Sequence, residues 1–244
     1  HSVVIAGGAA YTCGAGDAGQ LGLGDAKTQA YPRRVALGTG AARLLLAAGG
    51  GRHTMLVDAR GAVHACGCGS SGQLGTGLAV DEHKPVALAS LGGQLVRDAA
   101  AGDAHSVLLT LDGAVLTCGA NAVAQLGHAD RQPRHWPTAI ARLAAVRVTT
   151  IAAAADRTFA VTADGAVHAF GAAVGVEAAA EAAEEGSLVL LAGGAPTRTL
   201  SVACSPDGRS VAVLLAMRRA DSPVAAVTAA LSTAAAPAAA PAAA

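Results

Sequence analysis

The chain has 244 residues, enough for one large domain with a sizeable hydrophobic core. Its 17 basic and 17 acidic side chains cancel, so neither nucleic acid nor an anionic membrane surface is an expected partner, because both attract a surplus of Lys and Arg. Aromatic residues make up only 2%, which also disfavours a single-stranded nucleic-acid surface, where bases stack on aromatic rings.

The chain begins at His1 and shows no basic-then-apolar signal segment, so we expect a piece of a longer protein. No apolar run reaches the roughly eighteen residues that a membrane-spanning helix needs. The five cysteines are an odd number and are scattered, which favours a reducing intracellular compartment, cytoplasmic or nuclear.

In chain order, the first strong pattern is a recurring Cys-Gly pair that precedes a glycine-rich loop. It starts at Cys13, Cys66 and Cys118, spaced by 53 and 52 residues, and Phe170-Gly171 follows 52 residues later. Two further markers keep this spacing: a His-Ser/Thr or Arg-Ser/Thr step and an Arg-Gly or Asp-Gly pair. They stand at His1-Ser2, His53-Thr54, His105-Ser106, Arg157-Thr158 and Arg209-Ser210, and at Arg60-Gly61, Asp112-Gly113 and Asp164-Gly165. Shared periodicity indicates an internal repeat.

We therefore predict one repeat domain over residues 1–219, with units at 1–52, 53–104, 105–156 and 157–208 and a partial unit at 209–219. Within a unit the pattern is that of β-strands: residues 105–119 contain two short apolar runs joined by Asp-Gly, which supplies the positive φ angles of a tight hairpin. Stretches such as 85–88 and 95–101 add further strands. The fold class is all-β, a β-propeller of about four to five blades.

The Gly-Gln-Leu-Gly sequences at Gly19–Gly22 and Gly72–Gly75 resemble the signature of the regulator of chromosome condensation repeat family. The His-Ser step is also similar, whereas Cys13, Cys66 and Cys118 stand where that family usually has Trp. The resemblance covers residues 1–171 well and 172–215 poorly, and the third unit retains only Gln125, Leu126 and Gly127 of the loop. It implies a seven-bladed ring of which this chain would form part.

The C-terminal third departs from the repeat. Residues 172–186 are rich in Ala and Glu and favour a helix, either as an insertion in a blade or as a decayed loop. Residues 201–214 read as a strand, a turn and a strand, and also resemble tryptophan-aspartate propellers. Residues 220–244 are low in complexity, rich in Ala and Pro, and we expect a disordered or extended tail.

Two loops, 14–19 and 67–72, satisfy the Gly-x-Gly-x-x-Gly pattern of dinucleotide-binding proteins. Neither precedes a plausible helix start and both recur at the repeat period, so we interpret their glycines as structural. His53 and His105 occupy the same repeat position, where units four and five have Arg, and arginine cannot serve as a metal ligand. We therefore expect these histidines to bond backbone groups within each blade. The expected structural repeat positions are Gly14, Gly19, Gln20, Leu21, Gly22, Gly67, Gly72, Gln73, Leu74, Gly75, Gly119, Gln125, Leu126, Gly127, His53 and His105.

No catalytic, metal or cofactor site is predicted. Cys66-x-Cys68 lacks a second ligand pair at zinc spacing, and the repeat cysteines read as small buried apolar residues. No nucleophile elbow occurs, and the acidic pairs read as solvated charges.

The leading hypothesis is a non-catalytic scaffold that binds protein partners through the propeller faces. The family resemblance implies two alternatives: a guanine-nucleotide exchange factor for a small Ras-like GTPase, or the propeller of a larger HECT-type ubiquitin ligase. Chromatin attachment is disfavoured by the zero net charge, and ultraviolet sensing by the isolation of Trp136.

Overall fold

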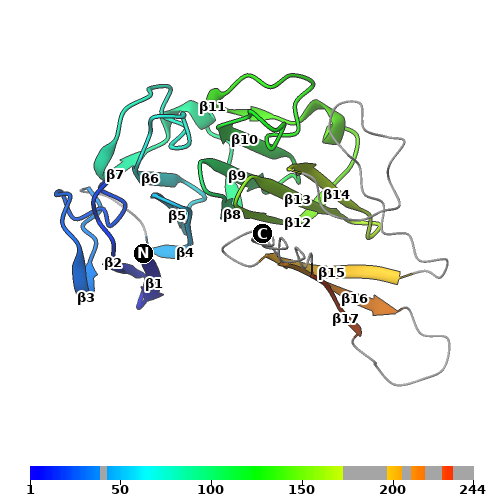
Figure 1. Cartoon of the computed structure of the whole chain (residues 1–244), viewed down its shortest axis with the longest axis horizontal. Coiled ribbons are helices and arrows are strands. Elements are labelled where there is room, and N and C mark those ends of the chain that lie inside the picture. Colours follow the sequence, from blue (N-terminus) through cyan, green and yellow to red (C-terminus); the bar gives the residue numbers. More distant parts are fainter. Residues whose placement is uncertain (39–42, 173–196, 205–209, 218–226, 233–244) are drawn as a thin grey trace, which may run out of the picture.

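The computed structural model describes residues 1–38, 43–172, 197–204, 210–217 and 227–232, which form five antiparallel sheets. The sheets follow one another along an arc, in the order of the sequence (Figure 1). Within each sheet the neighbouring strands are consecutive in the chain, so every connection is a simple hairpin or loop. This radial arrangement of small antiparallel sheets is a β-propeller, as the repeat predicts.

The first sheet comprises β1 (Ser2–Ala6), β2 (Ala9–Gly14) and β3 (Gln29–Arg34), and the second β4 (Leu44–Gly49), β5 (His53–Asp58), β6 (Val63–Gly67) and β7 (Glu82–Ala87). The third comprises β8 (Val96–Ala101), β9 (His105–Thr110), β10 (Val115–Gly119) and β11 (Arg134–Ala139). The fourth has β12 (Val148–Ala154), β13 (Arg157–Thr162) and β14 (Val167–Gly171), and the fifth β15 (Thr197–Cys204), β16 (Ser210–Met217) and β17 (Val227–Ser232).

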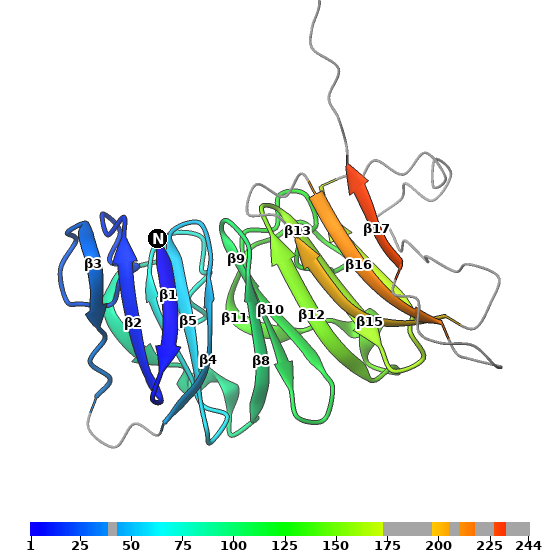
Figure 2. The same ribbon diagram turned by 90° about the horizontal axis from the view of Figure 1, so that it is seen from below.

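The strands β4, β8, β12 and β15 contact one another in series along the concave side of the arc, as Figures 1 and 2 show. Strands β7 and β11 lie on its convex side. The boundaries of the repeat units do not coincide with those of the sheets. The first strand of a sheet (β4, β8 or β12) ends before the His or Arg that marks the start of a new unit, so it belongs to the preceding unit. Strand β1 therefore has the phase of β5, β9 and β13, the second strands of the following sheets.

The predicted hairpins are present at each turn marker. Strands β9 and β10 pair with Val115 opposite Leu109, and Gly113 between them has a φ of 93°. Gly61 and Gly165 adopt the same left-handed region at the equivalent turns, with φ values of 75° and 92°. A residue with a side chain is strained in that region, so glycine at the second turn position determines where each strand reverses.

The hydrophobic core is divided among the junctions between neighbouring sheets. Between the second and third sheets, Met55, Val57 and Leu74 pack with Leu108 and Leu116. A second cluster joins the third and fourth sheets, and a third joins the first and second. Strands β5 and β9 are buried at every position, since each is covered by a neighbouring sheet on both faces. They accordingly have continuous apolar runs rather than alternating patterns.

Two short 3-10 helices, Ala89–Leu91 and Ala141–Leu143, interrupt the loops that follow β7 and β11, and they insert Leu91 and Leu143 into the core. The sequence pattern did not predict them, because a helix of three residues has no periodicity to detect. No described helix has the length and hydropathy needed to span a membrane.

At the C-terminal end, the expected strand-turn-strand of residues 201–214 corresponds to β15 and β16, which pair in antiparallel register. Strand β17 lies inside the predicted tail and pairs with β16, so residues 227–232 form a strand rather than disordered chain. This stretch contains Val227 and Thr228, which favour strands, and β16 offers its free edge. The Ala/Glu segment after residue 172 and Asp207-Gly208 fall outside the described residues.

Candidate functional site: the junctions between blades

Each glycine-rich loop is closed by its own glutamine. The side-chain Oε1 of Gln20 accepts a hydrogen bond from the backbone N–H of Ala18 at 2.8 Å, and Gln73 and Gln125 make the equivalent bonds at 2.9 and 3.1 Å. The following leucines, Leu21, Leu74 and Leu126, are buried. The glutamine thus shapes the turn while the leucine anchors it in the core.

The backbone carbonyl of the same glutamine is the acceptor for the next blade. Thr54 Oγ1 donates to the carbonyl of Gln20, Ser106 Oγ to that of Gln73, and Thr158 Oγ1 to that of Gln125, each at 2.7 Å. All of these groups are buried, so each bond satisfies a carbonyl that water cannot reach. This bond ties each loop to the following sheet.

The histidines extend the same chain of bonds. Nε2 of His53 lies 2.9 Å from Ser106 Oγ, and Nε2 of His105 lies 2.9 Å from Thr158 Oγ1. Because each hydroxyl gives its own hydrogen to a glutamine carbonyl, it must accept from Nε2–H, which determines the histidine tautomer. The expectation of backbone bonds within a blade was therefore wrong: these side chains bond a hydroxyl of the next blade.

The opposite nitrogen of each ring, Nδ1 of His53 and of His105, is buried and has no hydrogen-bond partner among the described residues. Burial lowers the pKa of His53 to about 3 and that of His105 to about 4, so both imidazoles are neutral near pH 7.

Glycine three positions before each histidine makes room for the ring. A Cβ on Gly50 would lie 2.6 Å from His53 Nδ1, and a Cβ on Gly102 would lie 2.5 Å from the carbonyl oxygen of Ala155 and overlap the His105 ring. In the fourth blade Ala154 takes this position, and the marker there is Arg157, whose Nε donates to the carbonyl of Ala172 at 3.2 Å. Glycine and histidine thus occur together in the second and third blades and are replaced together in the fourth.

The repeat cysteines face the same carbonyls. Cys66 Sγ lies 3.7 Å from the Gln20 carbonyl and Cys118 Sγ lies 3.6 Å from that of Gln73. Both are buried, and burial raises the pKa of each thiol to about 12, which keeps it protonated. In the fourth blade Phe170 lies against Gly127 as Cys66 lies against Gly22.

The repeat glycines combine positive φ with close approach. Gly14, Gly67 and Gly119 have φ values of 95°, 107° and 112°, and a Cβ on Gly67 would lie 2.7 Å from His53 Cα. Gly19 and Gly72 have φ values of 80° and 84°. Turns and bends follow the two dinucleotide-like patterns, and no helix is described over residues 15–28 or 68–81.

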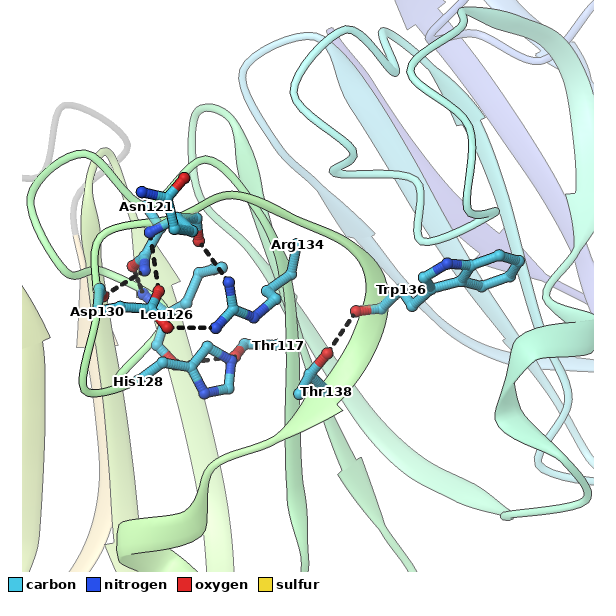
Figure 3. A network of polar contacts seen from close by, with 9 residues as sticks. Thr117, Asn121, Leu126, His128, Asp130, Arg134, Trp136 and Thr138 are labelled. Atoms are coloured by element: carbon cyan, nitrogen blue, oxygen red, sulfur yellow. Dashed lines mark hydrogen bonds and ion pairs between the residues drawn. The ribbon is translucent and has the colours of Figure 1, made fainter.

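The third loop keeps its shape with a different set of side chains (Figure 3). Asn121, at the position of Gly16 and Gly69, accepts from the backbone N–H of Leu126 at 3.0 Å and donates to the carbonyl of Asp130 at 2.7 Å. The carboxylate of Asp130 pairs with Arg134 at 2.6 Å. This network was missed from the sequence, where only the Asn at a glycine position signals it.

Trp136 projects from β11 over the loop of the preceding blade (Figure 3). A Cβ on Gly77 would overlap the indole ring, and the Gly77 N–H donates to the carbonyl of His135 at 2.9 Å. Lys84 and Gly24 form the equivalent pair one blade earlier. The side chain of Trp136 is nevertheless 55% exposed and that of Leu78, beside Gly77, is 59% exposed. We call these two residues the Trp136 patch.

Over the part of the chain that the structure describes, no three His, Cys, Asp or Glu side chains gather in a way that could hold a metal ion. The polar groups singled out from the sequence are therefore distributed over three similar junctions and do not converge on one centre.

Comparison with protein-family models matches the "Regulator of chromosome condensation (RCC1) repeat" to residues 7–57, 60–109 and 112–161. Among curated proteins, the chain is 32% identical over 173 residues to the Ultraviolet-B receptor UVR8 of Arabidopsis thaliana, an alignment that covers 70% of this chain and 39% of that protein. It is 36% identical over 163 residues to the probable E3 ubiquitin-protein ligase HERC3 of Homo sapiens, covering 66% and 15%. The chain thus spans well under half the length of these relatives.

Two solved structures resemble the fold. Human WBSCR16 superposes with a TM-score of 0.73 at 19% identity, over 87% of this chain and 56% of that one. Prp20p of Saccharomyces cerevisiae superposes with a TM-score of 0.66 at 22% identity, over 84% and 52%. At such identities the likeness concerns the fold alone.

Proposed function

This chain belongs to the regulator of chromosome condensation repeat family, and from that premise we propose that its blades form a non-catalytic module that binds a protein partner. The side chains that could carry chemistry support this proposal, because they are engaged in holding blades together. His53, His105, Cys66 and Cys118 are all buried at blade junctions.

The observation that carries the proposal is the Trp136 patch. Trp136 lies in β11 between His135, whose carbonyl accepts from the Gly77 N–H, and Pro137. Its indole packs against Gly77, so these contacts position it without burying it. A large aromatic side chain that is rigid and exposed loses little conformational entropy on binding and displaces much water, which is why tryptophan is enriched at energetically important interface positions. We infer that the partner contacts this rim of the third blade.

The test uses the purified chain as bait in an extract of its source, with cross-linking and quantitative mass spectrometry. Trp136→Ala removes the aromatic side chain of the patch. Tyr31→Ala is the matched control, because Tyr31 precedes Pro32 as Trp136 precedes Pro137 and is 80% exposed. We expect wild type and Tyr31→Ala to recover the same partner and Trp136→Ala to recover it at least about tenfold less well, the loss typical of an interface anchor. Equal recovery by Trp136→Ala would reject the patch, and no enrichment over an unrelated propeller would reject the module.

A second candidate is nucleotide exchange. The solved structure of Prp20p is described together with that protein's binding to Gsp1p and histones, and it shares this fold. As this second candidate, we propose that the chain binds a small Ras-like GTPase and accelerates release of its guanine nucleotide. Release of a fluorescent guanine nucleotide, measured over a panel of such GTPases, tests it; no acceleration at any chain concentration would exclude exchange by these blades.

A third reading follows from HERC3, whose name describes a probable ubiquitin ligase and of which this chain matches 15%. In that case the blades would recruit partners for a catalytic domain elsewhere in the protein. The sequence that flanks this chain in its source decides this reading, since a ligase domain would be recognisable there.

A further inference from the structure

The second, third and fourth sheets share one backbone contact at the end of the blade where the second and third strands are joined by a hairpin turn. We call this end the hairpin end. There the residue that opens the turn donates its backbone N–H to the carbonyl of the residue before the first strand. The bond is 2.8 Å long in each sheet and joins Ala59 to Arg43, Leu111 to Leu95, and Ala163 to Arg147. The three pairs are therefore structurally equivalent.

The third blade differs from its neighbours in having leucine at both positions of this pair. Leu95 is 48% exposed and Leu111 is 55% exposed. Since arginine and alanine form the same bond in the neighbouring blades, the turn does not require either leucine. Large apolar side chains that lie together on a protein surface mark a binding site. We call Leu95 and Leu111 the leucine pair.

Leu95 is positioned by the hairpin of the preceding blade. A Cβ on Gly61 would lie 3.0 Å from Leu95 Cβ, and the backbone N–H of Val96 donates to the carbonyl of Gly61 at 2.9 Å. Val146, in the loop before β12, adds a third apolar side chain at this end and is 37% exposed. An apolar surface that is already ordered loses little conformational entropy on binding.

An arginine lies on either side of the leucine pair. Arg60 precedes Gly61, against which Leu95 packs, and the stem of Arg147 lies against the hairpin of the third blade, where a Cβ on Gly113 would be 2.7 Å from its Cγ. Both arginines are exposed, and neither forms an ion pair among the described residues. A guanidinium presents paired N–H donors that fit a carboxylate.

The wider surface around the leucine pair is also basic. Among the described residues at the hairpin ends of these three blades, five exposed side chains are cationic and two are anionic: Arg43, Arg60, Arg97, Arg142 and Arg147, and Asp112 and Asp164. Asp98, which follows Arg97, is half-buried, so five positive charges face at most three negative ones. The carboxylates of Asp112 and Asp164 also accept hydrogen bonds from the hydroxyls of Thr110 and Thr162 in their own blades. Charge complementarity therefore favours an acidic partner.

We propose that the leucine pair, with Arg60 and Arg147 beside it, is a docking surface for a segment of a partner protein that carries apolar side chains flanked by Asp or Glu. The apolar side chains of the segment cover the leucine pair, and its carboxylates accept hydrogen bonds from the two arginines. The hairpin end lies before β6 and the loop that contains Leu78 lies after it, so this surface is separate from that part of the Trp136 patch. The inference thus goes beyond the proposed function.

The probe is a phage library of random peptides of about twelve residues, selected on the whole chain and, in parallel, on an unrelated propeller. Enriched peptides are then synthesised with a fluorescent label, and their binding is measured by anisotropy. We expect the enriched peptides to combine at least two large apolar residues with at least two Asp or Glu. We also expect their binding to weaken by at least about threefold when the salt concentration is raised from about 0.05 to 0.5 M, because exposed charges are then screened.

Two variants locate the surface. Leu111→Ala introduces the residue that both neighbouring blades have at this position, so the chain is expected to stay folded and to bind at least about tenfold less tightly, the loss expected for a leucine side chain buried on binding. Arg147→Gln is expected to weaken binding about threefold, as for an exposed ion pair. The matched controls are Val80→Ala and Arg131→Gln, which change exposed side chains in the glycine-rich loops, and their effect is expected to stay within about twofold.

Every outcome decides between these expectations. No enrichment over the unrelated propeller would overturn the proposal, and so would enriched peptides that lack Asp and Glu or bind Arg147→Gln as well as wild type. Undiminished binding by Leu111→Ala with an unchanged melting transition would overturn the location. Peptides that are lost with Trp136→Ala but retained by Leu111→Ala would overturn this inference and leave the proposed function in place.

Discussion

The two buried histidines make the stability of the repeat depend on pH. His53 and His105 each donate from Nε2 to a hydroxyl of the next blade, and Nδ1 of each ring has no hydrogen-bond partner among the described residues. Protonation would place a second N–H at Nδ1, in a buried position with nothing to receive it. Burial is the main reason why the pKa of His53 lies at about 3 and that of His105 at about 4 rather than near 6.5, and the neighbouring His105 lowers the pKa of His53 further.

The sign follows from the proton balance. In the unfolded chain both histidines bind a proton below about pH 6.5, whereas the folded chain binds none until about pH 4. The free energy of unfolding is therefore constant above pH 6.5 and falls as the pH drops toward 4. Each histidine contributes a slope of about 1.4 kcal/mol per pH unit, so between pH 7.5 and 5.0 the pair removes about 4 kcal/mol. That is a large share of the roughly 5–15 kcal/mol by which domains are stable.

The assay is urea unfolding at pH 7.5 and pH 5.0, for wild type and for the double variant His53→Gln with His105→Gln. A glutamine Nε2 can reach the same hydroxyl but does not titrate. We expect the loss of stability on acidification to be about 4 kcal/mol smaller in the variant, and to be unchanged in the control His83→Gln, because His83 is exposed. If wild type and double variant lose the same free energy, or if NMR titration of the folded protein shows His53 with an ordinary pKa, the argument from the unpartnered Nδ1 is refuted.

Three further outcomes are expected. Ala124→Gly should raise the free energy of unfolding by about 1 kcal/mol, measured by urea unfolding, because Ala124 has a φ of 62° where the first two loops have glycine; no gain would mean that the loop is not strained there. Gly102→Ala should lower it by about 2 kcal/mol or more, seen as a lower melting temperature, because the new methyl group meets the His105 ring and the Ala155 carbonyl. In native buffer at pH 8 a thiol-specific reagent should label half-buried Cys68 at least about a hundred times faster than Cys66, whose pKa is raised by burial to about 12; equal rates, read by peptide mass spectrometry, would contradict the assigned burial.

Much of the fold can be predicted from the sequence, because each hairpin depends on a few adjacent residues and the same pattern recurs in each repeat unit. The Asp112-Gly113 pair between two apolar runs predicts a hairpin from the needs of a few residues, and its recurrence at a spacing of 52 residues predicts that the hairpins stack. The family can be recognised from the Gly-Gln-Leu-Gly loops. In each of these four-residue sequences both glycines adopt positive φ and the leucine is buried.

The candidate sites were less accessible to such reasoning. His53 and His105 were expected to form hydrogen bonds within their own blade. Each ring instead bonds a hydroxyl group 53 residues further along the sequence, and this contact exists only because two sheets pack together. Trp136 appeared isolated, and only the packing of β11 on the preceding loop shows that it is held over Gly77.

By itself, then, the sequence determined the repeat, the strand-turn-strand units and the family, because hairpin turns and strand patterns depend on neighbours in the chain. The tertiary structure alone decided the direction of the hydrogen bonds between blades and the strand at residues 227–232. These depend on contacts between residues far apart in the chain.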